Sequence, residues 1–234
     1  MAASQELINR VAKHLKEYMA RYDSSHDFHH LERVLGLSHA IYKQLKTTEA
    51  PINLDPTIIS LSALLHDVGD KKYVTEEEDA ATMIRELLLG FGADRELAEK
   101  VQTICNGVSW SSEIKDPEMV KKLIEKYPEL AVVQDADRLD ALGAVGIGRV
   151  FTYGGAKDRK MEDSMLIFES NLLKMEASMK TGPGKQMAKQ RTEILKTFQK
   201  WWYVEAKTAS VGASVLKSAL DNESSGVEDE ERPC

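Results

Sequence analysis

Apolar residues recur at helical spacing along almost the whole of this 234-residue chain. Three of the clearest runs are Leu7, Val11, Leu15 and Met19; Val34, Leu37, Ile41 and Leu45; and Leu97, Val101, Ile104 and Val108. Steps of three and four positions put one apolar stripe along a helix, whereas a half-buried strand alternates apolar and polar residues. We find no convincing alternation and no Asn-Gly or Asp-Gly turn between two such runs. The pattern therefore predicts an all-α fold.

Helix boundaries are expected where turn-forming residues interrupt these runs. The Asp-Pro steps at 55–56 and 116–117 each place a capping carboxylate before a proline that suits the first helical position. A Gly-Pro-Gly segment at 182–184 predicts a third break, after which the last long helix is expected from about Lys185 toward Thr208. These breaks separate helices of one domain, which we expect to span residues 1–207.

The C-terminal region, residues 208–234, is expected to be an appendage to that domain. A short helix is predicted over residues 210–220. The segment DNESSGVEDEERPC that follows is acidic and almost free of large apolar groups, so it cannot bury enough surface to fold and is expected to be a disordered tail.

Composition narrows the classes of function. A formal net charge of −7 argues against a nucleic-acid groove, because a phosphate backbone requires a concentrated positive face. No stretch approaches the roughly 20 consecutive apolar residues that span a bilayer, so no membrane association is expected. The amphipathic start is no secretory leader, which predicts an intracellular protein, in the cytoplasm with the nucleus left open. Cys105 and Cys234 stand far apart, so any metal must be held by nitrogen and oxygen.

The segment HDFHHLERV, at 26–34, contains three of the six histidines. If a helix begins near Asp27, then His26, His30 and Arg33 fall close to one face, with His29 beside them. The cluster could therefore converge on one ligand. The alternative, to which the histidines alone give about equal weight, is a solvated polar helix start that Asp27 caps.

Two further segments favour a ligand. In LSALLHDVGDKKY, at 61–73, an apolar run is followed by His66 and Asp67 just before a glycine, which favours a metal corner over the alternative of a structural ion pair with a distant arginine. In AVVQDADRLD, at 131–140, three acids lie within another apolar helix: Asp135, Asp137 and Asp140. One of these acids would complete a site of two nitrogens and two oxygens with His30, His66 and Asp67. Such a set suits Mn²⁺, Fe²⁺, Mg²⁺, Co²⁺ or Zn²⁺.

Taken in order, His30, then His66-Asp67, then Asp137 resembles the H…HD…D signature of the HD superfamily of metal-dependent phosphohydrolases. HDFHHLERV is similar to the opening motif of the family, ALLHDVGDKKY to its second segment, and VQTICNGVSW to a following helix. QDADRLDALGAVGIGRVFTYGGA and MKTGPGKQMAKQRTEILKTFQKWWYVE resemble the YedJ/YpgQ-like branch. The resemblance covers roughly residues 5 to 206 and implies an HD-domain helical bundle.

The resemblance also implies roles for individual residues. The metal ligands would be His30, His66, Asp67 and Asp137, holding one divalent ion, with manganese expected first. The substrate-side residues would be His26, Asp27, Arg33, Asp70, Lys72 and Arg138. Among these, Arg33, Lys72 and Arg138 are candidates for phosphate binding, with Asp27 as a further substrate contact. Asp70 or His26 would move the proton.

The implied reaction is the hydrolysis of a nucleotide. We expect a nucleoside or deoxynucleoside triphosphate to be cut to a monophosphate and pyrophosphate, and a homodimer is compatible with the chain. The alternative function is a non-catalytic metal- or nucleotide-binding module for sensing or partner recruitment. Ile167 and Asn171 favour that alternative, because the branch usually has a histidine and a lysine there. The intact set of candidate ligands favours catalysis.

Overall fold

The computed structural model describes residues 2–47, 53–70 and 79–224. Within those ranges every regular element is a helix, which confirms the all-α prediction. The α-helices are α1 (Ala2–Tyr18), α2 (Phe28–Leu45), α3 (Pro56–Leu65), α4 (Met83–Gly90), α5 (Arg95–Asn106), α6 (Trp110–Lys115), α7 (Pro117–Lys126), α8 (Glu129–Asp140), α9 (Gly143–Ala156), α10 (Met161–Ile167), α11 (Leu173–Met175), α12 (Gly182–Ala206) and α13 (Thr208–Ser224). Short 3₁₀ turns occupy Met19–Arg21 and Glu176–Ser178, and a π-helix occupies Phe168–Leu172.

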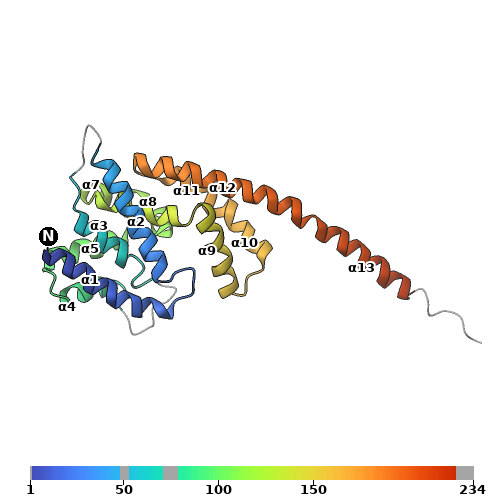
Figure 1. Cartoon of the computed structure of the whole chain (residues 1–234), viewed down its shortest axis with the longest axis horizontal. Coiled ribbons are helices and arrows are strands. Elements are labelled where there is room, and N and C mark those ends of the chain that lie inside the picture. Colours follow the sequence, from blue (N-terminus) through green and yellow to red (C-terminus); the bar gives the residue numbers. More distant parts are fainter. Residues whose placement is uncertain (1, 48–52, 71–78, 225–234) are drawn as a thin grey trace, which may run out of the picture. The chain divides into compact units, whose positions relative to one another are not determined.

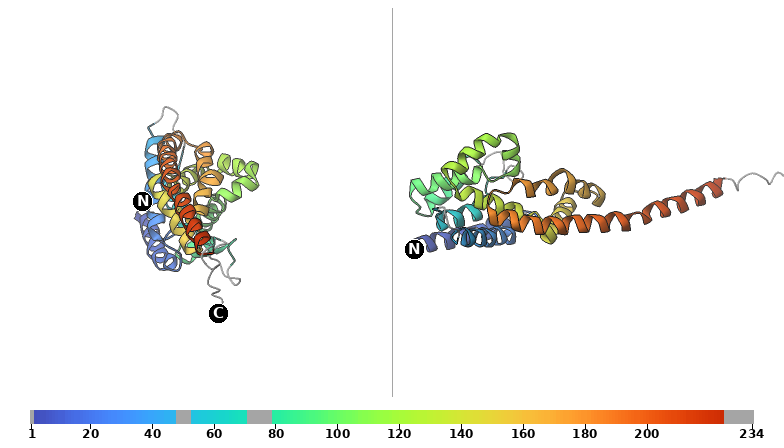
Figure 2. Two further views of the ribbon diagram at one scale, coloured as in Figure 1. Left: turned by 90° about the vertical axis from the view of Figure 1, so that its right-hand side faces the viewer. Right: turned by 90° about the horizontal axis from the view of Figure 1, so that it is seen from above.

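The chain divides into two compact units, residues 1–195 and residues 196–234. In the first unit α3 is the central helix and contacts α1, α2, α5 and α8 (Figure 1). Its residues from Ile58 to Leu65 are all buried, as expected of a helix that other helices surround on every side. α2 and α8 also lie side by side although they are far apart in the sequence (Figure 2). The core therefore brings α2, the end of α3 and α8 together.

The two Asp-Pro steps start helices as predicted. The Asp55 carboxylate accepts a hydrogen bond of 2.7 Å from the Thr57 backbone N–H, and α3 begins at the proline between them. Asp116 accepts one of 3.0 Å from the Met119 N–H at the start of α7. Each cap satisfies a backbone donor that has no partner within the first turn of its helix.

The break expected at 182–184 lies inside a helix instead, since α12 begins at Gly182. Pro183 is tolerated there because an N–H in the first helical turn has no intrahelical acceptor to lose. Gly184 is required by packing, because a Cβ at this position would lie 2.2 Å from Oδ2 of Asp135. A glycine that looked like a helix breaker in the sequence therefore permits a close contact between two buried segments.

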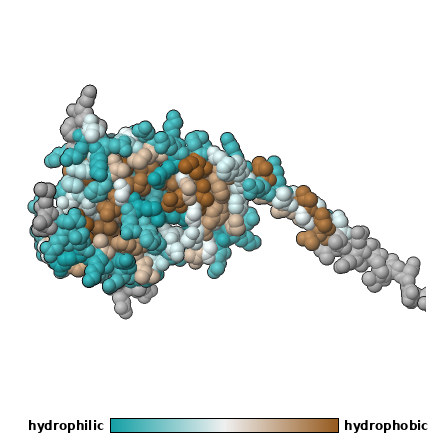
Figure 3. All heavy atoms as spheres, in the orientation of Figure 1, coloured by the Kyte–Doolittle hydropathy of each residue, from teal (hydrophilic) through white to brown (hydrophobic). Residues whose placement is uncertain are grey.

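The second unit contains the end of α12 and α13. α13 runs from Thr208 to Ser224, so it exceeds the helix expected over 210–220 and takes in the start of the segment for which we expected disorder. Residues 225–234 lie outside the described residues. Figure 3 shows apolar side chains along α13, where Val211, Val215 and Leu216 are exposed. No described helix is both long and apolar enough to span a membrane. The division between residues 207 and 208 stays a prediction.

Candidate metal centre

The histidines of HDFHHLERV, at the start of α2, lie in different surroundings. Asp27 is the cap of this helix, and its Oδ1 accepts a hydrogen bond of 3.1 Å from the His30 backbone N–H. The His30 side chain points into the first unit and is 1% exposed. His29, one position earlier, is 75% exposed and pairs with Glu32. The sequence left two alternatives for this segment, a helix start that Asp27 caps and a ligand site. The structure has the Asp27 cap and also a deeply buried imidazole, that of His30, so the two are compatible.

The next two side chains of the cluster, His66 and Asp67, lie at the end of α3. His66 directly follows the helix, and Asp67 comes next before the chain turns at Gly69. Gly69 has a φ of +80°, in the left-handed region that glycine adopts without steric cost. The His66 Nδ1 lies 2.9 Å from the carbonyl oxygen of Ala63, which fixes the ring against the last turn of α3. The glycine thus lets the chain leave while both side chains stay at the end of the buried helix.

These side chains meet Asp137 of α8 in one cluster. Nε2 of His30 and Nε2 of His66 are 3.3 Å apart. Both nitrogens are 3.4 Å from oxygens of Asp67 and 3.6 Å from Oδ1 of Asp137. One ligand atom each from His30, His66 and Asp137 lies within 4.8 Å of the others, a spacing that a single metal ion can bridge. The four ligands expected from the sequence are therefore brought together.

The hydrogen-bond partners of the two imidazoles indicate that a cation fits this cluster. His30 Nδ1 lies 2.8 Å from the Asp140 carboxylate, and His66 Nδ1 faces a carbonyl, so each Nδ1 must be the donor. In the neutral rings, which are the forms that can bind a metal, both Nε2 atoms then carry lone pairs that face one another and two carboxylates. Oδ2 of Asp67 is buried and has no hydrogen-bond donor within the described ranges. Such a concentration of lone pairs is unfavourable alone and suits a divalent ion.

The acid–base properties of the cluster reflect the same surroundings. Burial by itself would raise the pKa of Asp67, but the adjacent His66 and His30 hold that pKa well below its usual range. Burial would likewise lower the pKa of His66, yet Asp67 and Asp137 raise it to about 9. The two carboxylates therefore stay ionised and favour a positive charge at this point.

Asp140 makes contacts that the sequence did not reveal. It appeared there only as one of three acids that might bind the metal. In the structure its oxygens accept hydrogen bonds from Arg33 at 2.7 and 3.0 Å and from His30 at 2.8 Å, and Arg149 lies 3.3 Å away. Burial would raise the pKa of this carboxyl, but the bonds from His30 and Arg33 lower it. Asp140 thus orients a ligand and does not itself face the cluster.

Arg138 has contacts unlike those expected for a substrate residue. Its side chain is 1% exposed, donates to Glu113 at 2.5 Å and to Ser178 at 3.2 Å, and lies 5.1 Å from the Trp110 ring. Glu113 also pairs with Lys180 at 2.5 Å. Nothing in the sequence signalled Glu113, which stands on a short helix, α6, that has no fully buried residue. The structure therefore ties Arg138 into an internal ion network.

The remaining predicted residues lie around the cluster or outside the described ranges. The His26 ring is 6.1 Å from the His30 ring, and its Nδ1 lies 2.7 Å from Oγ of Ser25. Asp70 is the third residue after Asp67, and its backbone N–H donates to the Asp67 carbonyl at 3.2 Å. Lys72 lies outside the described residues. His26 is thus placed beside the predicted ligands.

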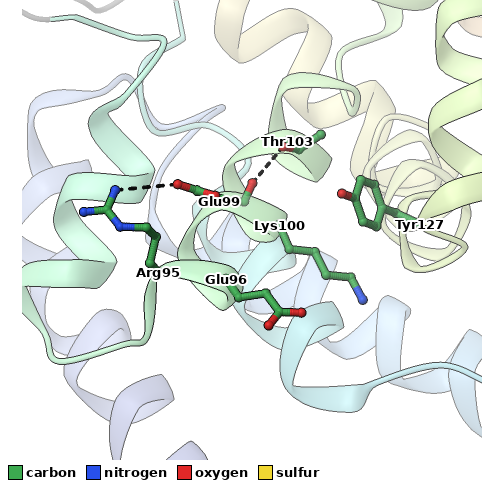
Figure 4. Close-up of a pocket in the computed structure, with 6 residues that line it drawn as sticks. All are labelled: Arg95, Glu96, Glu99, Lys100, Thr103 and Tyr127. Carbon is green, nitrogen blue, oxygen red and sulfur yellow. Dashed lines mark hydrogen bonds and ion pairs between the residues drawn. The ribbon is translucent and has the colours of Figure 1, made fainter.

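A separate hollow of about 490 Å³ lies on α5 and at Tyr127 (Figure 4). Its lining carries two basic and two acidic side chains, of which Arg95 and Glu99 lie 3.6 Å apart. None of the cluster residues lines it. The position of this hollow therefore does not locate the candidate metal centre. The nitrogen and oxygen atoms of the four predicted ligands locate it better.

Comparison with known proteins supports this interpretation. The Bacillus subtilis protein YpgQ is 31% identical over 182 residues, which make up 75% of this chain and 82% of YpgQ. The crystal structure of YpgQ in complex with ADP has a TM-score of 0.68 at 25% identity, covering 87% of this chain and 96% of that one. An HD-superfamily hydrolase from Bacillus thuringiensis has a TM-score of 0.65 at 29% identity, covering 87% and 98%.

The profile of the HD domain matches residues 27–142. This range includes His30, His66, Asp67 and Asp137, so the matched region and the cluster coincide. Because the profile, a relative above 30% identity and the solved folds agree, the chain belongs to the HD domain family and within it resembles the branch that contains YpgQ.

Proposed function

We propose that this protein is a metal-dependent phosphohydrolase that hydrolyses nucleoside or deoxynucleoside triphosphates to a monophosphate and pyrophosphate. The observation that carries the proposal is the cluster of His30, His66, Asp67 and Asp137, in which both Nε2 lone pairs face two carboxylates. Membership in a family with HD-superfamily hydrolases supports the hydrolytic reaction. The complex of YpgQ with ADP supports a nucleotide as the ligand class.

His30, His66, Asp67 and Asp137 would hold one divalent ion, for which manganese is our first choice. The nitrogen and oxygen donors also suit Mg²⁺, Co²⁺, Fe²⁺ and Zn²⁺. Such an ion, when bound, lowers the pKa of water and polarises a phosphate oxygen. Asp140 keeps the proton of His30 on Nδ1, so that Nε2 stays available as a ligand.

His26 is our first candidate for moving the proton. Its Nδ1 lies 2.7 Å from Oγ of Ser25 and its ring lies 6.1 Å from the His30 ring, so the imidazole is held beside the predicted ligands. Asp70 remains the second candidate. Among the phosphate-binding candidates, Arg33 uses Nε and Nη2 for Asp140 and would offer Nη1 to a phosphate oxygen. In this proposal Arg138 stabilises α8 and does not touch substrate, while Lys72 and Asp27 keep their predicted roles.

The test uses purified full-length protein loaded separately with Mn²⁺, Mg²⁺, Co²⁺ and Zn²⁺. Each form is incubated with nucleoside mono-, di- and triphosphates, and the release of phosphate and pyrophosphate is followed. We expect pyrophosphate from triphosphates with at least one metal. Tight nucleotide binding without turnover by any metal form would instead support the non-catalytic sensing module.

Variants of the histidines and of Asp137 test the assignment of residues. His30→Ala, His66→Ala and Asp137→Ala should each remove metal binding and turnover, because each deletes a ligand atom of the cluster. His26→Ala should retain the metal and slow turnover. His29→Ala is the matched control, since that exposed ring contacts Glu32 and should change neither quantity. Full turnover in His66→Ala would contradict the site.

A further inference from the structure

The arginines nearest to the candidate metal centre are already bound to carboxylates. Arg33 holds Asp140 through two nitrogens, and Arg149 lies 3.3 Å from the same carboxylate. Arg138 is bound to Glu113. A guanidinium that is committed to a carboxylate has few donors left for a multiply charged ligand. A strong phosphate-binding group must therefore be sought elsewhere among the described residues.

Arg159 has the required properties. Its guanidinium carbon lies 5.5 Å from the centre of the Tyr153 ring, and the side chain is partly buried. Among the residues that the structure describes, no carboxylate pairs with it. The aromatic ring limits the freedom of the long side chain, so less entropy is lost when a ligand binds. The ammonium of Lys157 lies 5.8 Å from the same ring and adds a second positive charge.

The backbone at the end of α9 fixes Arg159 in this position. The Arg159 N–H donates to the Gly154 carbonyl at 2.8 Å, and the Asp158 N–H donates to Gly155 at 3.3 Å. These two bonds form a Schellman motif, whose reversing residue is usually glycine. Asp158 occupies that position with a φ of +52°. The chain thus folds back at Asp158 and returns Arg159 to the ring of Tyr153, six residues earlier.

Tyr153 connects this cationic pair to the candidate metal centre. The centres of the Tyr153 and His26 rings are 5.5 Å apart in an edge-to-face arrangement. The His26 ring in turn lies 6.1 Å from the ligand His30. Three contacts in series, Arg159 with Tyr153, Tyr153 with His26 and His26 with His30, therefore connect the guanidinium to the cluster.

We propose that Arg159, held on the Tyr153 ring and assisted by Lys157, binds the phosphate groups of the substrate beyond the one that is attacked. The proposal rests on the proposed hydrolysis of nucleoside triphosphates, and it assigns the β and γ phosphates to this site. It also explains how one chain with net charge −7 presents a local positive surface to a polyphosphate. A monophosphate ester would not reach Arg159 and would gain nothing from it.

The experiment compares Arg159→Gln with the wild-type protein on two substrates in the metal-loaded form. One is deoxyadenosine triphosphate, and the other is the 4-nitrophenyl ester of thymidine 5′-monophosphate, whose phosphorus also carries a nucleoside 5′ oxygen and a good leaving group but no phosphate tail. We expect KM for the triphosphate to rise about 10- to 100-fold with kcat little changed, because the variant loses a charged hydrogen bond to the phosphate. KM for the ester should stay the same. Arg159→Lys should give an intermediate KM, and Lys160→Gln is the exposed control.

Three results would overturn the proposal. One is an unchanged triphosphate KM in Arg159→Gln. Another is an equal loss on both substrates, which would show that Arg159 only supports the C-terminus of α9 through the helix dipole. The third is a comparable rise in KM for Lys160→Gln, which would indicate unspecific attraction of anions.

A binding measurement separates this proposal from the proposed function. Calorimetric titration with inorganic tripolyphosphate needs no turnover. If the wild type hydrolyses no triphosphate but binds tripolyphosphate in a way that Arg159→Gln abolishes, the proposed reaction fails and the phosphate site stands. If triphosphates are hydrolysed but tripolyphosphate binds equally to both proteins, the reaction stands and the site fails.

Discussion

Replacing Asp140 with asparagine tests whether this residue controls the predicted metal ligand His30. The carboxylate is 1% exposed and accepts hydrogen bonds from Arg33 and His30, with Arg149 nearby. An asparagine of the same shape has a single acceptor oxygen and one NH₂ donor group. If the oxygen serves Arg33, the NH₂ faces Nδ1 of His30. The imidazole then carries its proton on Nε2, the nitrogen that should bind the metal.

Two magnitudes follow from these contacts. Loss of an oriented partner behind a metal-binding histidine lowers metal affinity about 10- to 100-fold. Removing one member of a buried ion pair costs about 3–5 kcal/mol in the free energy of unfolding. We expect the lower end, about 3 kcal/mol, because the Arg33 side chain is 36% exposed and water can reach it.

The assay is a titration of metal-free protein with Mn²⁺, together with urea unfolding of the metal-free form. Nitrogen NMR of His30 gives a third readout, since its tautomer should change in Asp140→Asn. Asp135→Asn is the matched control. Asp135 is a fully buried carboxylate on the same helix, bound to the backbone of Lys180 and Thr181. It should lose stability and keep metal affinity, so an equal loss of affinity in both variants, or none in Asp140→Asn, would refute the reasoning.

Three other predictions concern the first unit. Gly146→Ala should destabilise the protein by about 1–3 kcal/mol in urea unfolding, because the added Cβ would lie 2.1 Å from the Ala141 carbonyl oxygen. Gly148→Ala is the matched control: its Cβ would meet nothing within 4 Å, so it should stabilise the protein by up to about 1 kcal/mol. Arg138→Leu should lower the melting temperature by roughly 6–12 °C, as expected for about 3 kcal/mol, and leave the KM for triphosphate unchanged. Burial raises the pKa of the Cys105 thiol, so in a Cys234→Ser background iodoacetamide at pH 8 should label it only after unfolding in urea.

The helices could be predicted because their signals are local. The apolar spacing and the Asp-Pro starts at 55–56 and 116–117 depend on neighbouring residues alone. The segment at 182–184 misled us because a glycine can serve either a turn or a close contact, and only the position of Asp135 decides between them. Local patterns thus establish that a helix exists better than they locate its first residue.

The candidate site was predictable for a different reason. The order of His30, His66, Asp67 and Asp137 is a family motif, which carries information about contacts across the fold. Spacing alone could not have chosen Asp137, since Asp140 lies one turn later on the same helix. Asp140 turned out to contact residues 107 and 110 positions earlier in the chain, and no periodicity contains that information. Partners such as Glu113 are equally non-local.

The charged residues of α8 show why the helix can carry so many of them in the core. Asp135 is held by the backbone at Lys180, Asp137 faces the two histidines, Arg138 binds Glu113, and Asp140 binds α2. Each charge points in a different direction and meets a partner from a different segment, so none is buried unpaired. These bonds also oppose rotation of α8 about its axis. Because Oδ1 of Asp137 lies 3.6 Å from both Nε2 atoms, the pairs on the other faces of the helix help to hold this predicted ligand in position.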